Sequence, residues 1–335
     1  MLLPRLLLVL SLGLSALLGS AAAASADDTD PRFTIGVIPD TQNEVSRSGD
    51  DRFAQRTRWL AGRATGDDLR FVVHTGDVTD WGWAAGEQLS RARSAMDVLG
   101  AAGVPWQLAL GNHDSRRHGW NGQGGYGSLP YTQNPECTRR FGSACNDASL
   151  LRRTDETDAA FARSFAGRFE ADRIANAYRN FEAGGLRWMV LSLEPWPRAA
   201  VVEWAKSVAA HHPRRNIVIA THSYLDENGR IASSAEYGAT SPQQLWQQLV
   251  SQYANIKVVL SGHTGAAAYR TDTGVKGNKV ASFLGAFHSP DTNPVRLLTV
   301  DPTANSLTTR IFTPSNGAHL TRYDATVTGM GFVRP

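Results

Sequence analysis

Short apolar segments rich in β-branched residues alternate with helix-like segments over most of the chain, and this alternation limits the fold more than any other feature. The expected strands are Phe33–Ile38, Leu69–His74, Trp106–Leu110, Trp188–Leu193, Asn216–Ala220 and Ile256–Leu260. The expected helices between them are Asp51–Ala64, Gly86–Ala102, Ala199–His211 and Pro242–Tyr253. Strands that alternate with helices predict an α/β fold.

The pattern changes after Ser261, where four expected strands follow one another with no helix between them. They are Ala266–Arg270, Lys279–Phe287, Val295–Val300 and Ser306–Thr313, with Gly, Asn and Pro in the turns. Strands separated only by such turns are typical of antiparallel pairing. We therefore expect a second, more antiparallel sheet that closes the domain.

The first 26 residues have the pattern of a secretory signal peptide. Residues 6–18 are almost wholly apolar, and Ala24-Ser25-Ala26 matches the small-residue motif that precedes cleavage. The apolar run of about 13 residues is shorter than the ~20 that a spanning helix needs, and no later segment is long and apolar enough to span a membrane. We expect residues 1–26 to be removed and residues 27–335 to be secreted, to the periplasm or outside the cell. The alternative is an uncleaved N-terminal anchor.

The charge distribution argues against a nucleic-acid partner. The 335 residues carry a formal net charge of +3, and no run of basic residues exceeds two. Proteins that bind nucleic acids cluster their basic side chains on one face or along one helix. The sequence therefore shows no surface specific for nucleic acid.

Two cysteines, Cys137 and Cys145, lie eight positions apart in a polar, turn-rich stretch. Neither lies in a CxxC or Cys/His spacing, which argues against a zinc finger. Because an exported protein meets an oxidising environment, we expect a short loop-closing disulfide between them. Two unpaired thiols are the alternative.

Polar side chains that can bind metal follow five of the expected strands. They are Asp40 and Gln42 after the first, Asp77 after the second, Asn112 after the third, His222 after Asn216–Ala220 and His263 after Ile256–Leu260. Sites in open α/β sheets form outside the carboxyl ends of the strands, so we expect these residues to converge. A single Asp after a strand often only caps the next helix, but a succession of oxygen and nitrogen donors is hard to explain by capping.

The types of donor indicate the chemistry. Carboxylate and amide oxygens with imidazoles, and without a thiolate, suit divalent Mn, Fe, Zn or Mg and argue against Cu(I) or an iron–sulfur cluster. Two such ions ~3.5–4 Å apart form a clamp for displacement at phosphorus, and water bound to them becomes hydroxide near pH 7.

Five motifs, in this order, resemble the signature of the calcineurin-like metallophosphoesterases. They are Asp40-Thr41-Gln42, Gly76-Asp77-Val78-Thr79-Asp80, Gly111-Asn112-His113-Asp114, Thr221-His222 and Gly262-His263-Thr264. The resemblance implies that residues 27–335 form a four-layer α-β-β-α sandwich of two mixed sheets with flanking helices. It also implies a dinuclear metal site and hydrolysis of phosphoesters.

The same resemblance implies a role for each motif residue. Asp77 bridges the two metals, and Asp40 and Gln42 bind the first. The second metal's remaining ligands are Asn112, His222 and His263. His113 stabilises the transition state or protonates the leaving oxygen, and Asp114 orients the His113 ring.

Two positions depart from the commonest form of this signature. Gln42 stands where a His is usual, and Gly265 stands where the last motif usually ends in a second His. Both departures affect the first metal, which loses an imidazole that water can replace. We therefore expect weaker binding there and a harder ion, Mn or Mg. A mononuclear enzyme is the alternative to the two divalent ions.

The long Gly-rich loop after His113 is our prediction for substrate contacts. It carries Arg116, Arg117, His118 and Tyr126, and guanidinium groups match phosphate oxygens well. A solvated loop without a binding role is the alternative. Asp80 is either a group that supports the metal site or a cap of the next helix.

These observations together predict an exported phosphoesterase that hydrolyses phosphomonoesters or phosphodiesters by attack of a metal-bound hydroxide. The substrate is a small-molecule or polymer phosphoester, which the sequence does not identify further. No GxxxxGK[ST] motif is present, which argues against chemistry driven by nucleoside triphosphates. A catalytically weak, secreted binding module on the same scaffold is the alternative, and Gln42 and Gly265 are the features that favour it.

Overall fold

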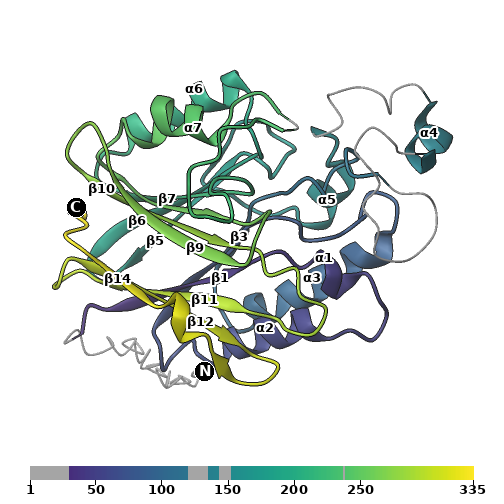
Figure 1. Cartoon of the computed structure of the whole chain (residues 1–335), viewed down its shortest axis with the longest axis horizontal. Helices are drawn as coiled ribbons and strands as arrows, with labels where there is room; N and C mark the ends of the chain where they lie inside the picture. The colour runs from purple at the N-terminus through teal and green to yellow at the C-terminus, as the bar shows by residue number, and fades with distance from the viewer. Residues whose placement is uncertain (1–29, 120–134, 143–151, 237) are drawn as a thin grey trace, which may run out of the picture. The chain divides into compact units, whose positions relative to one another are not determined.

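Two seven-stranded β-sheets lie between two layers of helices in residues 30–119, 135–142, 152–236 and 238–335, the part of the chain that the computed structural model describes (Figure 1). The first sheet has the order β13-β12-β11-β1-β2-β3, with β14 paired to β12. Its strands are β1 (Phe33–Ile38), β2 (Leu69–His74), β3 (Trp106–Leu108), β11 (Val295–Asp301), β12 (Ser306–Thr313), β13 (Ala318–His319) and β14 (Ala325–Thr328).

The second sheet has the order β4-β5-β6-β7-β8-β10-β9. Its strands are β4 (Gly167–Arg168), β5 (Ala177–Ala183), β6 (Leu186–Leu193), β7 (Asn216–Thr221), β8 (Ile256–Ser261), β9 (Ala267–Thr273) and β10 (Lys279–Gly285). Both sheets are mixed, because β1-β2-β3 and β6-β7-β8-β10 run parallel while β11, β5 and β9 pair antiparallel with the adjoining strand of these parallel sets.

Alternating apolar side chains hold the four layers together. Ile35 of β1 and Val218 of β7 belong to the buried cluster that joins the faces of the two sheets. Ile217 and Ile219 of β7 point to the opposite face, where they pack with α6 (Ala199–His211). Because both faces of the central strands are buried, these strands are apolar along nearly their whole length.

Helices cover the outer face of each sheet (Figure 1). The first sheet is covered by α2 (Arg52–Ala61) and α3 (Gly86–Ala101), and the second by α6, α7 (Pro242–Leu245) and the π-helical turn η3 (Trp246–Val250). The short helices are α1 (Gln42–Val45), α4 (Pro135–Phe141), α5 (Asp155–Ala160) and the 3₁₀ turn η4 (Thr321–Tyr323). The α/β sandwich of two mixed sheets with flanking helices is therefore confirmed.

The second, antiparallel sheet expected after Ser261 was wrong. The hairpin of β9 and β10 joins the second sheet through parallel pairing of β10 with β8, whereas β11 and β12 join the first sheet through antiparallel pairing of β11 with β1. The reason is that β1 and β8 each offer an unpaired edge in a different sheet, and every buried strand must pair its backbone. Strand β5 was not predicted, and its side chains are buried only at the two ends, Ala177 and Ala183.

Several expectations fall outside the described residues. The signal peptide at residues 1–26, Tyr126 and Cys145 all lie there, so their roles stay predictions. Cys137 lies buried in α4, and its disulfide with Cys145 likewise stays a prediction. Among the helices that the structure describes, none is both long and apolar enough to cross a bilayer.

Candidate metal centre

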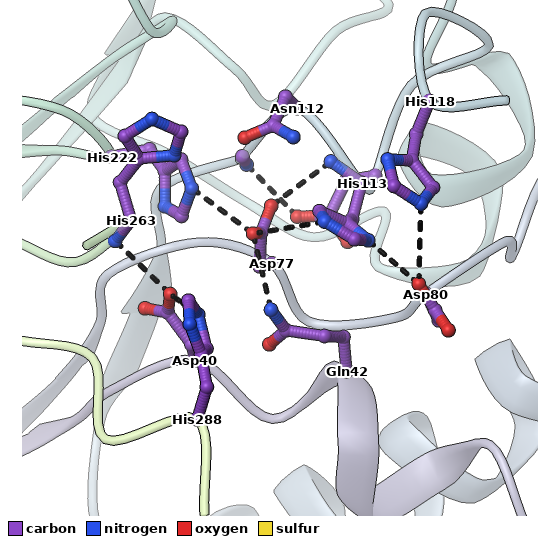
Figure 2. Close-up of polar contacts among 12 residues, drawn as sticks. Asp40, Gln42, Asp77, Asp80, Asn112, His113, His118, His222, His263 and His288 are labelled. Atoms are coloured by element: carbon purple, nitrogen blue, oxygen red, sulfur yellow. Dashed lines mark hydrogen bonds and ion pairs between the residues drawn. The ribbon is translucent and has the colours of Figure 1, made fainter. Parts of the chain in front are cut away.

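The loops that follow six strands of both sheets converge on one cluster of polar side chains (Figure 2). The cluster contains all six predicted metal ligands, namely Asp40 and Gln42 after β1, Asp77 after β2, Asn112 after β3, His222 after β7 and His263 after β8. The sixth loop, after β10, adds His288. The structure thus brings the predicted residues together, while their roles as ligands stay predictions.

Asp77 lies at the centre of this cluster and is almost fully buried. Its Oδ1 accepts a hydrogen bond of 2.9 Å from the His113 backbone N–H, and its Oδ2 lies 3.1 Å from His222 Nε2 and 3.4 Å from Gln42 Nε2. Burial opposes ionisation, but the imidazoles of His222 and His113 outweigh it and hold the pKa of Asp77 well below its ordinary value. Asp77 is therefore an ionised carboxylate with both oxygens facing neighbouring motifs.

The backbone around Asp77 explains why Gly111 precedes Asn112. Asp77 has a left-handed φ of 51°, which turns its carboxylate toward the end of β3. A Cβ atom at Gly111 would lie 2.0 Å from Asp77 Oδ1, far inside van der Waals contact. Only glycine leaves room for this carboxylate, so the Gly-Asn-His-Asp and Gly-Asp motifs interlock.

Two buried side chains fix the loops that carry Asp40 and Asp77. Arg56 of α2 pairs with Glu44 and donates a 2.9 Å hydrogen bond to the carbonyl of Pro39, the residue before Asp40. His74 lies 3.0 Å from Thr41 Oγ1 through Nε2 and accepts from the Gly76 N–H at 3.2 Å through Nδ1. Burial lowers the pKa of His74 to about 3, so this ring stays neutral and links the two loops.

His222 presents one ring nitrogen to the centre. Its Nδ1 lies 3.0 Å from the carbonyl oxygen of Thr75, which can only accept a hydrogen bond, so the ring hydrogen is assigned to Nδ1. The Nε2 lone pair then faces the Asp77 carboxylate, and two such acceptors at 3.1 Å need a proton or a cation between them. Burial alone would lower the pKa of His222, but Asp77 raises it to about 9. The Asp77 carboxylate therefore favours a positive charge at this position.

Three predicted ligand atoms are buried and have no hydrogen-bond partner in the described part of the chain. They are Asp40 Oδ1, Gln42 Oε1 and Asn112 Oδ1. An unsatisfied buried polar atom costs roughly 1–3 kcal/mol, so three of them in one cluster need an explanation. Cations bound among them would satisfy all three, and oxygen and imidazole donors suit divalent ions. The donor set therefore fits the metals that the sequence predicts.

His113 is oriented by Asp80, which corrects the prediction that Asp114 does this. Asp80 Oδ1 lies 2.7 Å from His113 Nδ1, and His113 Nε2 lies 3.8 Å from Asp77 Oδ2. Burial would lower the pKa of His113, but Asp77 and Asp80 raise it to about 9.

The carboxylate of Asp114 has a different task. It accepts hydrogen bonds of 2.9–3.1 Å from the backbone N–H groups of Gly111, Val78 and Thr79. Asp114 therefore joins the loops after β2 and β3 rather than touching the His113 ring. The backbone N–H groups that follow Asp77 bind the carboxylate of Asp114. Residue type and spacing alone could not show whether Asp80 or Asp114 contacts the His113 ring.

The predicted substrate loop is only partly directed toward the centre. The ring of His118 stacks on His113 with centroids 3.4 Å apart, and His118 Nε2 lies 3.5 Å from Asp80 Oδ1. Arg116 turns away, because its Nη2 pairs with Glu156 of α5 at 2.7 Å. Arg117 follows in the same loop, and its backbone N–H donates to Ser115 Oγ at 3.2 Å. Among the described residues of this loop, His118 is therefore the one whose ring lies against His113.

His288 is a residue that sequence reasoning missed. Its Nε2 lies 2.9 Å from Asp40 Oδ2, and ligand atoms of Asp40, Asp77 and His288 all lie within 4.8 Å of one another. The available signal was a His three positions after the end of β10, but the expected strand Lys279–Phe287 was assigned to a separate sheet. Asp40 Oδ2 also accepts from the His263 N–H at 3.0 Å, and His263 Nε2 lies 3.2 Å from Glu236 Oε2.

Comparison with protein families gives a match to the calcineurin-like phosphoesterases over residues 33–266, more than half of the chain. The chain belongs to this family. The matched region includes all six predicted ligands, His113 and Asp80, and ends before His288.

Relatives of known sequence or structure are distant. The uncharacterized protein YvnB of Bacillus subtilis strain 168 is 25% identical over 240 residues, covering 72% of this chain but only 16% of that protein. A dimetal phosphatase from Danio rerio has a similar fold, with a TM-score of 0.51, 13% identity and coverage of 88% of this chain and 98% of that one. GAP50, the anchor in the inner membrane complex of Plasmodium, has a TM-score of 0.50, 12% identity and 89% coverage of each chain.

The family and the geometry support the same general chemistry. Two groups of acidic and His side chains, Asp80-His113-His118 and Asp40-Asp77-His288, each bring their ligand atoms within 4.8 Å of one another. The Oδ2 atom of Asp77 faces both His222 and Gln42, while its Oδ1 faces the backbone of His113. His113 holds a ring N–H donor at the rim of the same cluster.

Proposed function

We propose that this chain is an exported, metal-dependent phosphoesterase that hydrolyses phosphomonoesters or phosphodiesters at a dinuclear centre. The observation that carries the proposal is the convergence of three buried, unpartnered oxygen atoms, and of His222 Nε2, around the ionised Asp77. Asp77 would bridge the ions, Asp40 and Gln42 would hold the first, and Asn112, His222 and His263 would hold the second. Bound ions supply Lewis-acid activation of water and neutralise charge on the phosphoryl oxygens.

The chain's own residues supply the positioning and a proton. Asp80 holds Nδ1 of His113, so that Nε2 faces the space beside Asp77. A protonated Nε2 there would donate to an oxygen that gains charge as the ester bond breaks, in the manner of a preorganised donor. Nδ1 of His222 stays fixed on the Thr75 carbonyl, which keeps its Nε2 aimed at the centre.

The proposal is tested by turnover of p-nitrophenyl phosphate and bis-p-nitrophenyl phosphate with added Mn²⁺. Asp77→Asn and His222→Ala are expected to lose activity, while His211→Ala, on the exposed end of α6, retains it as a matched control. Unchanged activity in both site variants would remove this assignment. Comparison of the two esters also distinguishes a monoesterase from a diesterase.

A second candidate is a binding module with little catalysis, because the similar fold of GAP50 belongs to a protein described as an anchor. Gln42 and Gly265 are the departures from the family signature that favour it. Metal analysis of the purified chain separates the two candidates. Less than one ion per chain, with no turnover of either ester, would favour the binding module.

We propose as well that residues 1–26 direct export and that Cys137 and Cys145 form a disulfide outside the cytoplasm. Intact-mass analysis of the exported protein is expected to show a chain that begins at Asp27 and is two hydrogens lighter than its reduced form. A retained leader or two free thiols would contradict these assignments.

A further inference from the structure

The backbone excludes a side chain at position 265, where the last motif of the family usually has its second His. Gly265 has a left-handed φ of 66°, which L side chains rarely adopt. A Cβ atom there would also lie 2.8 Å from the Cβ and 3.1 Å from the Cα of Glu227. The conformation of this loop therefore leaves no room for an imidazole side chain at position 265.

The segment that follows β10 runs beside this position and brings an imidazole to Asp40. The N–H groups of Ala286 and Phe287 donate to the carbonyls of Ala266 and Gly265 at 2.9 and 3.3 Å, so the end of β10 runs beside the last motif. Phe287 has a left-handed φ of 54°, uncommon for a residue other than glycine, and His288 follows directly. The backbone is thus turned sharply just before the residue whose ring reaches Asp40.

The distances suit two ligands of one ion. Two donors each ~2.1 Å from a metal, at a right angle, lie ~3 Å apart. His288 Nε2 lies 2.9 Å from Asp40 Oδ2, and Figure 2 shows its ring beside the Asp40 carboxylate. Asp40 Oδ1 is one of the buried atoms without a hydrogen-bond partner. The three-residue group Asp40, Asp77 and His288 therefore has the spacing of a metal site.

We propose that His288 is a ligand of the first metal and replaces the imidazole that position 265 cannot carry. This inference rests on the dinuclear centre of the proposed function. The first metal's protein ligands would then be Asp40, Gln42, Asp77 and His288. An imidazole in this set weakens the expectation of Mn or Mg there, because nitrogen donors also suit Fe and Zn.

The test is Mn²⁺ binding to the metal-free full-length chain, measured by isothermal titration calorimetry and by the electron paramagnetic resonance signal of a coupled Mn pair. Wild type and His211→Ala are expected to bind two ions and to show the coupled signal. His288→Ala should bind one ion as tightly as wild type and the second at least tenfold more weakly, with loss of the coupled signal at two equivalents. Asp77→Asn should weaken both.

The outcomes separate this inference from the proposed function. Two ions with unchanged affinity in His288→Ala would show that His288 is only a hydrogen-bond donor to Asp40, and would overturn the inference alone. Failure of wild type to bind any Mn²⁺ would overturn the inference and the dinuclear centre together. Thermal unfolding in EDTA, expected to be the same for wild type and His288→Ala because this ring is 39% exposed, excludes a general folding defect.

Discussion

The two halves of the candidate metal centre differ in how deeply their side chains are buried and how firmly they are held. On one side, His222 is completely buried, Asn112 is 6% exposed, and the His222 ring is fixed by a backbone carbonyl. On the other side, His288 is 39% exposed and follows a turn after β10 that lies outside the family motifs. We therefore expect the preorganised side to bind its ion tightly and the exposed side to exchange its ion more readily, although both sides offer donors.

The largest effect is expected from Asp77→Asn, because this carboxylate serves both halves. Loss of its charge should reduce kcat/KM by roughly 1,000-fold, at the upper end of what one electrostatic group contributes. Metal content should fall at both sites, measured by inductively coupled plasma mass spectrometry. Loss of only one ion would show that Asp77 serves one half of the centre and does not join the two halves.

Gly111→Ala should be nearly as harmful although it removes no functional group. The added methyl would lie 2.0 Å from Asp77 Oδ1 and force that carboxylate or β3 to move. Overpacking of a buried site costs about 1–3 kcal/mol of unfolding free energy, and we expect roughly a 100-fold loss of kcat/KM as well. Gly66→Ala is the matched control, because a Cβ there meets no atom within 4 Å. Equal activity in the two variants would contradict the packing argument.

His222→Ala and His288→Ala each remove one imidazole, the first from the preorganised half and the second from the exposed half. The first should lower kcat/KM by about 100-fold and resist rescue by added metal, because the preorganised half is lost. The second should lower it by about 10-fold at limiting Mn²⁺ and recover at high Mn²⁺, because water can fill the exposed position. Activity measured across a Mn²⁺ titration checks both. Identical behaviour of the two variants would mean that the halves are equivalent.

Asp80→Asn should give the smallest effect, about 10-fold in kcat, and a change in pH dependence. Burial lowers the pKa of His113, while Asp77 and Asp80 raise it, so removal of the Asp80 charge must lower that pKa. Activity that requires protonated His113 is present below this pKa and lost above it, so the basic limb of the pH–rate profile should move to lower pH. Asp114→Asn should instead reduce stability without moving that limb, since Asp114 binds backbone N–H groups. A shift of equal size in both variants would contradict the assignment of Asp80.

The sequence predicted secondary structure best where the hydrophobic pattern of a segment is strong by itself. The bounds of β1, β2 and α6 were predicted to the residue, because continuous apolar runs and helical periodicity are strong there. The sheet to which β9–β12 belong was not predictable, since pairing depends on which strand edge is free in space. His288 was missed for the same reason: its role depends on β10 lying parallel to β8.

The choice between Asp80 and Asp114 marks a second limit of sequence reasoning. Both carboxylates follow motif strands, and both are buried. Their partners differ only because the loop after β2 presents its N–H groups to Asp114 while leaving Asp80 beside the ring of His113. Such a difference of a few ångströms follows from backbone direction, which residue type and spacing do not encode.

The donor side chains come from loops of both sheets, with Asp40, Asp77 and Asn112 from the first and His222, His263 and His288 from the second. Cations held among them would cross-link the two sheets and raise the unfolding temperature, with a stabilisation that grows as the logarithm of ion concentration over Kd. If residues 1–26 direct export as proposed and the chain folds afterwards, it would meet its ions only outside the cytoplasm. The metals it carries would then be chosen by the surroundings in which the two sheets close, and not by the cytoplasm in which the chain is made.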